Sequence, residues 1–128
     1  MARIAIIGGG SMGEAMLSGL LRSGRQVKDL VVAERMADRA KYLSGSYGVL
    51  VTSVREAVEH AAVIVVAVKP GDVDAVVTDL ASAATAAERD SAEQVFVTIA
   101  AGIGINFFES KLPAGTPVIR AMPNAAAL

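Results

Sequence analysis

The sequence contains no cysteine and no tryptophan, and aromatic residues make up only 4% of its 128 residues. The lack of cysteine excludes a disulfide scaffold, cysteine-ligated zinc and thiol catalysis. Hydrophobic residues nevertheless account for 53% of the chain, so the core has to be built from Ala, Val, Ile and Leu. This composition favours helices packed on a parallel sheet over an aromatic-rich sandwich.

An excess of either charge is also missing, since 12 basic and 13 acidic residues give a formal net charge of −1. Lys and Arg are spread along the chain, so we expect no nucleic-acid partner and no binding to an acidic membrane. No apolar run has the length of a membrane span, and the apolar start is too short for a signal peptide. We therefore expect a single cytoplasmic domain that spans residues 1–128.

A glycine-rich turn follows the first apolar run, residues 4–7, and an amphipathic helix follows the turn. Gly8, Gly10 and Gly13 fall in the G-x-G-x-x-G register of dinucleotide-binding turns. Gly8 allows the tight reversal, Gly10 lets a pyrophosphate approach the backbone, and Gly13 lets the helix pack on the sheet. The helix N-terminus favours a phosphate. The Ser11 hydroxyl either bonds that phosphate or simply sits in the first helical turn.

Apolar runs and helical periodicities alternate along the rest of the chain. The predicted strands are residues 4–7, 30–33, 49–51, 63–68, 94–99 and 118–120. The predicted helices are residues 15–21, 38–43, 53–60, 73–87 and 105–112; Gly45 or Gly48 closes the second, and Ser53 and Glu56 form a capping box for the third. Right-handed crossovers then predict an α/β, doubly wound, Rossmann-type sheet that is mainly parallel, with about six strands ordered 3-2-1-4-5-6.

Ligands of such sheets bind beyond the carboxyl ends of the strands. The segments that follow predicted strands should therefore line one crevice together with the glycine turn. They are Glu34-Arg35, Lys69-Pro70, Ala100-Ala101-Gly102 and Met122-Pro123-Asn124.

Glu34 and Arg35 give conflicting indications about the cofactor. An acidic residue at the end of the second strand accepts hydrogen bonds from the adenosine ribose and favours NAD. A neighbouring arginine can instead pair with the 2′-phosphate of NADP. The third interpretation is that both are solvated charges at the start of a loop.

The remaining polar candidates do not form a catalytic set. We interpret residues 68–70 as a wall near the nicotinamide, to which Lys69 contributes backbone more than its ammonium group. Asn124 either bonds a carboxamide or substrate, or is a turn residue after proline. His60 is assigned to a helix end or the surface. No catalytic residue and no metal ligand is predicted.

Four stretches together resemble the amino-terminal domain of the pyrroline-5-carboxylate reductase family. They read IIGGGSMGEA (6–15), AVKPG (67–71), TIAAGI (98–103) and VIRAMPN (118–124). The first stretch fits many dehydrogenases, whereas the other three in this order and spacing are far more specific. The resemblance covers essentially the whole chain.

The resemblance implies an enzyme that uses NADPH, or NADH, to reduce 1-pyrroline-5-carboxylate, a small imine, to L-proline. It implies that the backbone around Gly10, Ser11 and Met12 holds the pyrophosphate. Val68, Lys69 and Pro70, together with Ala100, Ala101 and Gly102, would border the ribose and nicotinamide, with Asn124 on the nicotinamide or substrate side. Family members continue into a helical domain that forms the homo-oligomer and holds the substrate, so we expect that domain to be missing from this chain.

Two other functions remain open. Dehydrogenases of the 3-hydroxyacid type and deazaflavin-dependent NADP reductases share the glycine turn. A domain that senses NAD(P) without turnover would also bind the cofactor, and it would contact a regulatory partner instead of an imine.

Overall fold

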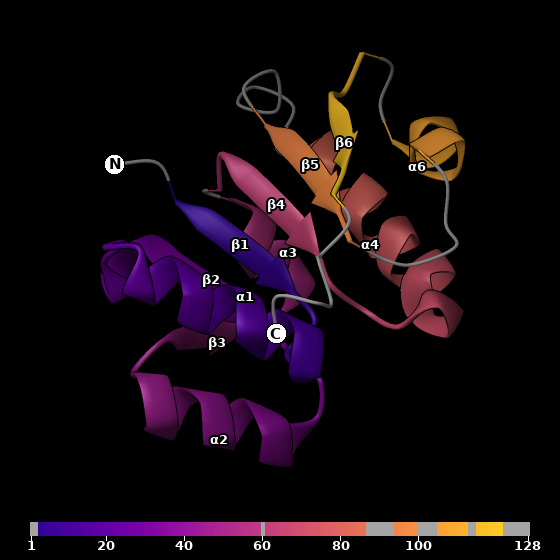
Figure 1. Ribbon diagram of the computed structural model, residues 1–128. Coiled ribbons are helices and arrows are strands. Elements are labelled where there is room, and N and C mark those ends of the chain that lie inside the picture. Colours follow the sequence, from indigo (N-terminus) through magenta and orange to yellow (C-terminus); the bar gives the residue numbers. More distant parts are fainter. Residues whose placement is uncertain (1–2, 60, 87–93, 100–104, 113–114, 122–128) are drawn as a thin grey trace.

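The computed structural model describes residues 3–59, 61–86, 94–99, 105–112 and 115–121. Its sheet is parallel throughout, with the order β3-β2-β1-β4-β5-β6, as predicted (Figure 1). The strands are β1 (Ile4–Ile7), β2 (Leu30–Ala33), β3 (Leu50–Thr52), β4 (Val63–Val66), β5 (Val95–Thr98) and β6 (Val118–Arg120). The helices are α1 (Ser11–Arg22), α2 (Ala37–Tyr47), α3 (Val54–Glu59), α4 (Val73–Ala86) and α6 (Ile105–Lys111), with short 3-10 turns η1 (Val27–Asp29) and η2 (Pro70–Asp72).

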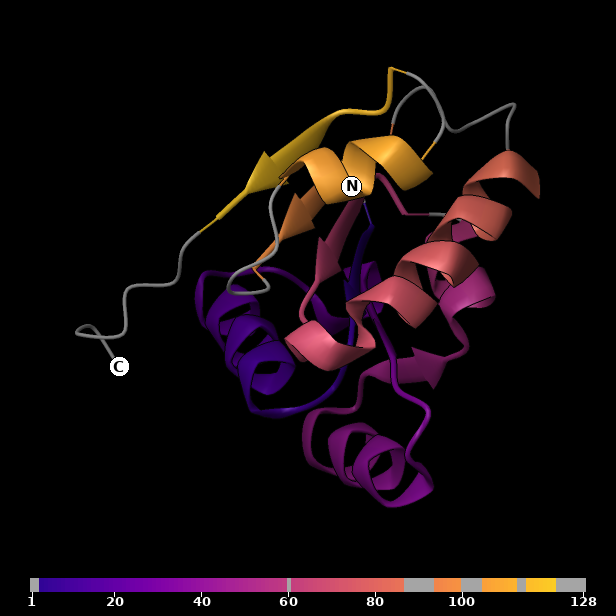
Figure 2. The ribbon, with the colours of Figure 1, turned by 90° about the vertical axis from the view of Figure 1, so that its right-hand side faces the viewer.

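Helices cover both faces of the sheet, because successive strand side chains point to opposite faces. Ala5 and Ile7 of β1 belong to an apolar cluster that includes residues of α3, α4 and α6. Ile4 and Ile6 belong to a second cluster, with Leu17 of α1 and Leu43 of α2. The two helical layers are visible on either side of the sheet in Figure 2. Burial on both faces explains the uninterrupted apolar runs of the sequence.

The register of the sheet places the carboxyl ends of neighbouring strands at one edge. Ile7, the last residue of β1, is level with Ala33 of β2 on one side and with Val66 of β4 on the other. The segments that follow these strands are therefore neighbours. The glycine turn and the loops after β2 and β4 meet here.

Most element boundaries follow the sequence pattern, with shifts of one to four residues at several ends. The β3 strand starts at Leu50, one residue later than predicted, and of the two glycines predicted to close α2, Gly48 is the one that does so. Gly48 has a φ of 71°, which suits the left-handed residue that closes a helix. The β4 strand ends at Val66 instead of residue 68, since the chain then turns into η2, which starts at a proline.

The structure confirms half of the capping box predicted at the start of α3, namely the bond from the Glu56 amide to the Ser53 hydroxyl. The amide of Glu56 donates to the hydroxyl of Ser53 over 3.3 Å, and that hydroxyl donates to the Glu56 carboxylate over the same distance. His60 lies outside the described residues.

Gly13 and Gly19 of α1 offer a matched test of the helix–strand contact. A methyl group at Gly13 would overlap the carbonyl oxygen of Gly8, whereas one at Gly19 meets nothing within 4 Å. We expect Gly13→Ala to destabilise the fold by about 1–3 kcal/mol through overpacking. Gly19→Ala should stabilise it by roughly 0.5–1 kcal/mol, because alanine is the better helix former. Urea unfolding measures both; equal effects of the two substitutions would contradict a special contact at Gly13.

Candidate functional site

The glycine turn has the geometry that its motif requires. Gly8 adopts a φ of 105°, and its amide donates to the carbonyl of Ala33 over 2.8 Å. Gly10 precedes α1 as its N-cap, and a side chain built there would meet no atom within 4 Å. Gly13 packs directly on the carbonyl of Gly8. The turn is thus tight at Gly8, open at Gly10 and packed against the strand end at Gly13.

The open side of the turn presents backbone amides. The first amides of a helix have no partner within the helix, and the helix dipole adds positive charge there. Gly10, Ser11 and Met12 are exposed, and no side-chain hydrogen bond caps α1. This end of α1 can accept an anion such as a pyrophosphate. The role of the Ser11 hydroxyl stays a prediction.

A cavity of about 1280 Å³ lies beside the turn, at the carboxyl ends of β1 to β4 and between α2 and α4. It brings together predicted residues from three strand ends, which are Gly8, Gly10, Glu34, Arg35, Val68 and Lys69. Val68 also touches the turn, since a side chain at Gly8 would come within 2.8 Å of its Cγ1. Ser11, Met12 and Gly13 are not among the cavity-lining residues, and Pro70 opens η2 next to Lys69. Ala100, Ala101, Gly102 and Asn124 lie outside the described residues.

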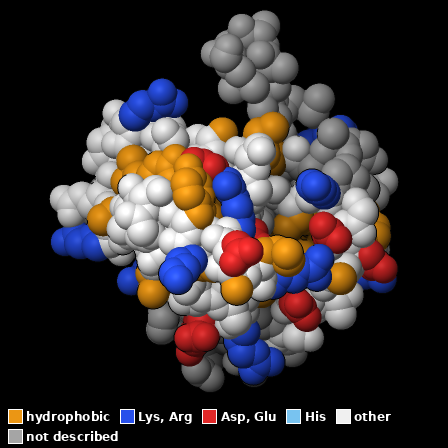
Figure 3. Space-filling view, turned by 90° about the horizontal axis from the view of Figure 1, so that it is seen from below, with side chains coloured by type: hydrophobic (Ala, Val, Ile, Leu, Met, Phe, Trp, Pro, Cys, Tyr) orange, Lys and Arg blue, Asp and Glu red, His pale blue; other side chains and the backbone are white. Residues whose placement is uncertain are grey.

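Basic, acidic and apolar side chains are interspersed over the face shown in Figure 3. The cavity lining has the same character, with arginines at positions 35, 39 and 55 and acidic residues at positions 34, 38, 72 and 79. A mixed lining suits a ligand that carries phosphates, sugar hydroxyls and a base together.

Glu34 is bonded to the protein backbone through both carboxylate oxygens. One oxygen accepts the amide of Gly9 over 2.8 Å, and the other accepts the amide of Met36 over 2.8 Å. The side chain therefore ties the loop after β2 to the glycine turn. Its predicted bond to an adenosine ribose stays a prediction.

Arg35 extends over the cavity and is 74% exposed. Its guanidinium lies 3.4 Å from the carboxylate of Asp72, which follows β4 in η2. An exposed pair at this distance holds the guanidinium only weakly. Arg35 can therefore turn to a phosphate group of a ligand.

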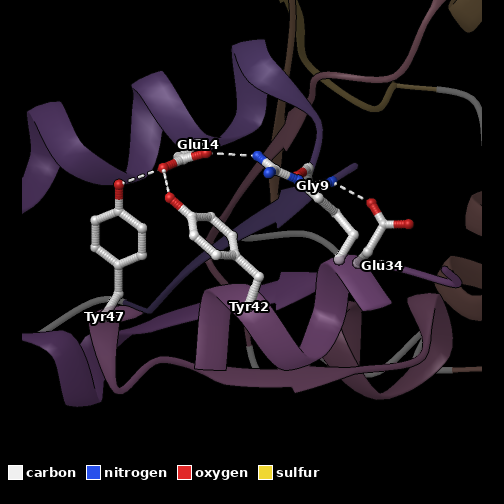
Figure 4. Close-up of polar contacts among 6 residues, drawn as sticks. Gly9, Glu14, Glu34, Tyr42 and Tyr47 are labelled. Atoms are coloured by element: carbon white, nitrogen blue, oxygen red, sulfur yellow. Dashed lines mark hydrogen bonds and ion pairs between the residues drawn. The ribbon is translucent and has the colours of Figure 1, made fainter. Parts of the chain in front are cut away.

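A side-chain network between α1 and α2 was not predicted from the sequence. The carboxylate of Glu14 accepts hydrogen bonds from Arg39 Nη2 at 2.5 Å, Tyr42 at 2.8 Å and Tyr47 at 2.6 Å. Figure 4 shows both tyrosines converging on Glu14 from α2. Arg39 also donates through Nε to the carbonyl of Gly9 over 2.6 Å, and its guanidinium lies 4.9 Å from the centre of the Tyr42 ring. The network thereby reaches the glycine turn.

The positions 39, 42 and 47 carry the only sequence signal for this network. Residues 39, 43 and 47 recur at helical spacing, so Arg39 and Tyr47 lie on the same side of α2 as the buried Leu43, and Tyr42 directly precedes Leu43 in the chain. Polar residues beside an apolar stripe indicate a polar contact at the edge of the core, but they do not identify its partner.

These contacts shift the pKa values of the network. The hydrogen bonds from Tyr47, Tyr42 and Arg39, in that order, lower the pKa of Glu14 to about 2. The hydrogen bond to Glu14 raises the pKa of each tyrosine. At neutral pH the carboxylate is charged and both hydroxyls keep their protons, so all three donors remain in place.

The residues that the structure describes include no metal-binding cluster and no membrane-spanning helix. No group of three or more His, Asp or Glu side chains in that part of the chain is placed to hold a metal ion. No described helix is long and apolar enough to cross a membrane. Lys69 is exposed at the cavity, and its predicted backbone role stays a prediction.

The parallel sheet of this order, with a glycine turn between β1 and α1 and a cavity at the carboxyl edge, defines a Rossmann-type domain. The chain belongs to the family described as NADP oxidoreductase, coenzyme F420-dependent, whose model matches residues 3–102.

Within this family, the chain is similar to several pyrroline-5-carboxylate reductases. Over its whole length the chain is 76% identical to pyrroline-5-carboxylate reductase of Mycobacterium tuberculosis, strain CDC 1551 / Oshkosh, and it spans 43% of that protein. A pyrroline-5-carboxylate reductase structure from Coxiella burnetii matches with a TM-score of 0.87 and 27% identity, over 97% of this chain and 44% of that one. The Plasmodium falciparum pyrroline carboxylate reductase with NADP bound matches at a TM-score of 0.77 and 19% identity, over 96% of this chain and 42% of that one, which shows a shared fold.

The Glu14 network predicts a dependence of stability on acid. The folded-state pKa of Glu14 lies near 2, below its usual value of 4.5. Its contribution to stability is therefore complete above about pH 4.5 and is lost as the pH falls toward 2. Glu14→Gln should destabilise the protein at pH 7 and have little effect near pH 2. Chemical unfolding at several pH values measures this; a difference independent of pH would contradict it.

Tyr47→Phe should raise the pKa of Glu14 more than Tyr42→Phe, because the Tyr47 bond is the largest cause of the shift. NMR titration of the Glu14 carboxyl carbon checks this order. A larger effect of Tyr42→Phe would show that the shorter Tyr47 bond is not dominant in solution.

Proposed function

We propose that this chain is the dinucleotide-binding domain of an NAD(P)H-dependent enzyme that reduces 1-pyrroline-5-carboxylate to L-proline. The observation that carries the proposal is the 76% identity to the mycobacterial reductase over the whole chain. The open glycine turn and the adjoining cavity support it, because they supply a phosphate-binding backbone and space for the rest of a dinucleotide.

In this proposal the amides of Gly10, Ser11 and Met12 bind the pyrophosphate. The adenosine half occupies the cavity between α2 and α4, next to Glu34 and Arg35. Val68, Lys69 and Pro70 border the nicotinamide ribose after β4, with residues 100–102 and Asn124 completing that side. The carboxyl-edge rule for doubly wound sheets supports one crevice for these segments, and the resemblance to the reductase family implies which part of the cofactor each one borders.

The reduced nicotinamide supplies a hydride to the carbon of the C=N bond. An iminium carbon is already electrophilic, so the protein can act mainly by positioning the two reactants and excluding water. No side chain of this chain is assigned as an acid or base. The groups that hold the substrate and form the oligomer are proposed to lie in the part of the enzyme beyond the 43% that the chain matches.

The family description favours one alternative, an NADP reductase that uses the deazaflavin coenzyme F420. The two reactions are distinguished by supplying the full-length protein with NADPH and either pyrroline-5-carboxylate or oxidised F420. We expect NADPH to be oxidised when pyrroline-5-carboxylate is supplied and not when F420 is supplied. Oxidation with F420 alone would replace the proposal, and cofactor binding without either reaction would indicate a sensing domain.

Arg35 is expected to select for the 2′-phosphate of NADPH, since its guanidinium is exposed at the cavity and only weakly paired. Arg35→Ala should weaken NADPH binding by about 1.5–3 kcal/mol, the range for a charged hydrogen bond, and leave NADH binding almost unchanged. Parallel titrations of the full-length protein with the two cofactors measure this. Equal losses for both would rule out the role, and Arg25→Ala, outside the cavity, is a control for loss of charge.

A further inference from the structure

The glycine turn needs an external constraint to hold its shape. It contains three consecutive glycines, Gly8 to Gly10, and glycine loses more backbone freedom on ordering than any other residue. A trans peptide is planar, so the carbonyl of one residue and the amide of the next point in opposite directions. Fixing one of these groups fixes the other.

Main-chain bonds hold the peptides at the two ends of the turn. The amide of Gly8 donates to Ala33 of β2 over 2.8 Å, and the carbonyl of Gly10 accepts the amide of Glu14 over 2.8 Å. These bonds belong to the strand and to the helix. They do not orient the two peptides between them.

Side chains hold the two middle peptides. Glu34 accepts the amide of Gly9 over 2.8 Å, which fixes the Gly8–Gly9 peptide (Figure 4). Arg39 donates to the carbonyl of Gly9 over 2.6 Å, which fixes the Gly9–Gly10 peptide. The second contact sets the direction of the Gly10 amide, the first amide at the open end of α1.

Arg39 is itself held in place. Its Nη2 bonds Glu14, which two tyrosines anchor, and its guanidinium stacks near the ring of Tyr42. The side chains of Arg39 and Glu14 are 33% and 23% exposed, so the pair is shielded more than a surface ion pair such as Arg35–Asp72. A guanidinium with two donors committed in this way is a rigid support for the Gly9 carbonyl.

We propose that Arg39 is a positioning residue that orients the Gly9–Gly10 peptide for binding the pyrophosphate of the dinucleotide. The inference rests on the proposed function, since it assumes that the turn binds a dinucleotide. Arg39 acts on the part of the cofactor that NADH and NADPH share. Its effect must therefore be the same for both cofactors, unlike that of Arg35.

The test uses the full-length protein with Arg39→Met and, as the control, Lys41→Met, an exposed lysine on the same helix that does not line the cavity. We expect the dissociation constants of NADH and NADPH to rise together by about tenfold, because cofactor binding then has to order the backbone of one residue that Arg39 no longer holds. The kcat at saturating cofactor and the KM for the imine should stay unchanged. Arg39→Lys, which keeps the charge without the planar fork, should recover part of the loss.

The other outcomes overturn the proposal. A loss for NADPH alone would show that Arg39 binds the 2′-phosphate directly, since the residue also lines the cavity. A lower melting temperature with unchanged affinities would show a purely structural role. If Arg39→Met does not fold, Tyr47→Phe decides, because Tyr47 is not a cavity-lining residue and reaches the turn through Glu14 and Arg39; it should weaken both cofactors equally, and unchanged affinities would overturn the proposal.

Binding is followed by nicotinamide fluorescence, which requires no turnover. A wild-type protein that binds both dinucleotides without reducing the imine would reject the proposed reaction and leave the role of Arg39 open to the same measurement. The two inferences therefore fail separately.

Discussion

The end of β1 is the constraint on which the rest of the structure depends. This strand lies between β2 and β4, with its backbone bonded on both sides, and its last residue is level with the ends of both neighbours. Gly8 continues the bonding to β2 by one residue, and Gly13 rests on the carbonyl of Gly8. The helix N-terminus is consequently fixed relative to the sheet, so an anion bound there has one position with respect to every other strand end.

Side chains from the loop after β2 and from α2 order the glycine turn itself. Glycine makes the close contacts possible, but it leaves the backbone free to adopt other conformations. Glu34 and Arg39 remove that freedom, because Glu34 accepts the amide of Gly9 and Arg39 donates to the carbonyl of the same residue. A side chain at Gly9 would come within 2.6 Å of Leu43 and 3.0 Å of Glu34, so the middle glycine of the run also allows a close approach.

The fold could be predicted from the sequence because its signals are local. Buried parallel strands are continuous apolar runs, and right-handed crossovers leave few possible strand orders. The lining of the cavity could be predicted only where it follows a strand end, as for Glu34, Arg35 and Lys69. The bond between Arg39 and Gly9 spans 30 residues, and those between the α2 tyrosines and Glu14 span 28 and 33, so no local pattern specifies them. They depend on how α1 and α2 pack on the same face of the sheet.

The structure also changes how Glu34 and Arg35, at the end of β2, bear on the choice between NAD and NADP. In the sequence, Glu34 and Arg35 have equal standing as indications of NAD and NADP. In the structure, both oxygens of Glu34 accept backbone amides, whereas Arg35 is largely exposed beside the cavity. Each amide occupies one lone pair of its oxygen, so the carboxylate keeps a reduced capacity to accept ribose hydroxyls and still repels a phosphate. Of the two charged side chains, Arg35 is therefore the more accessible to a ligand, which supports the proposal that the adenosine end of this cavity accepts a 2′-phosphate.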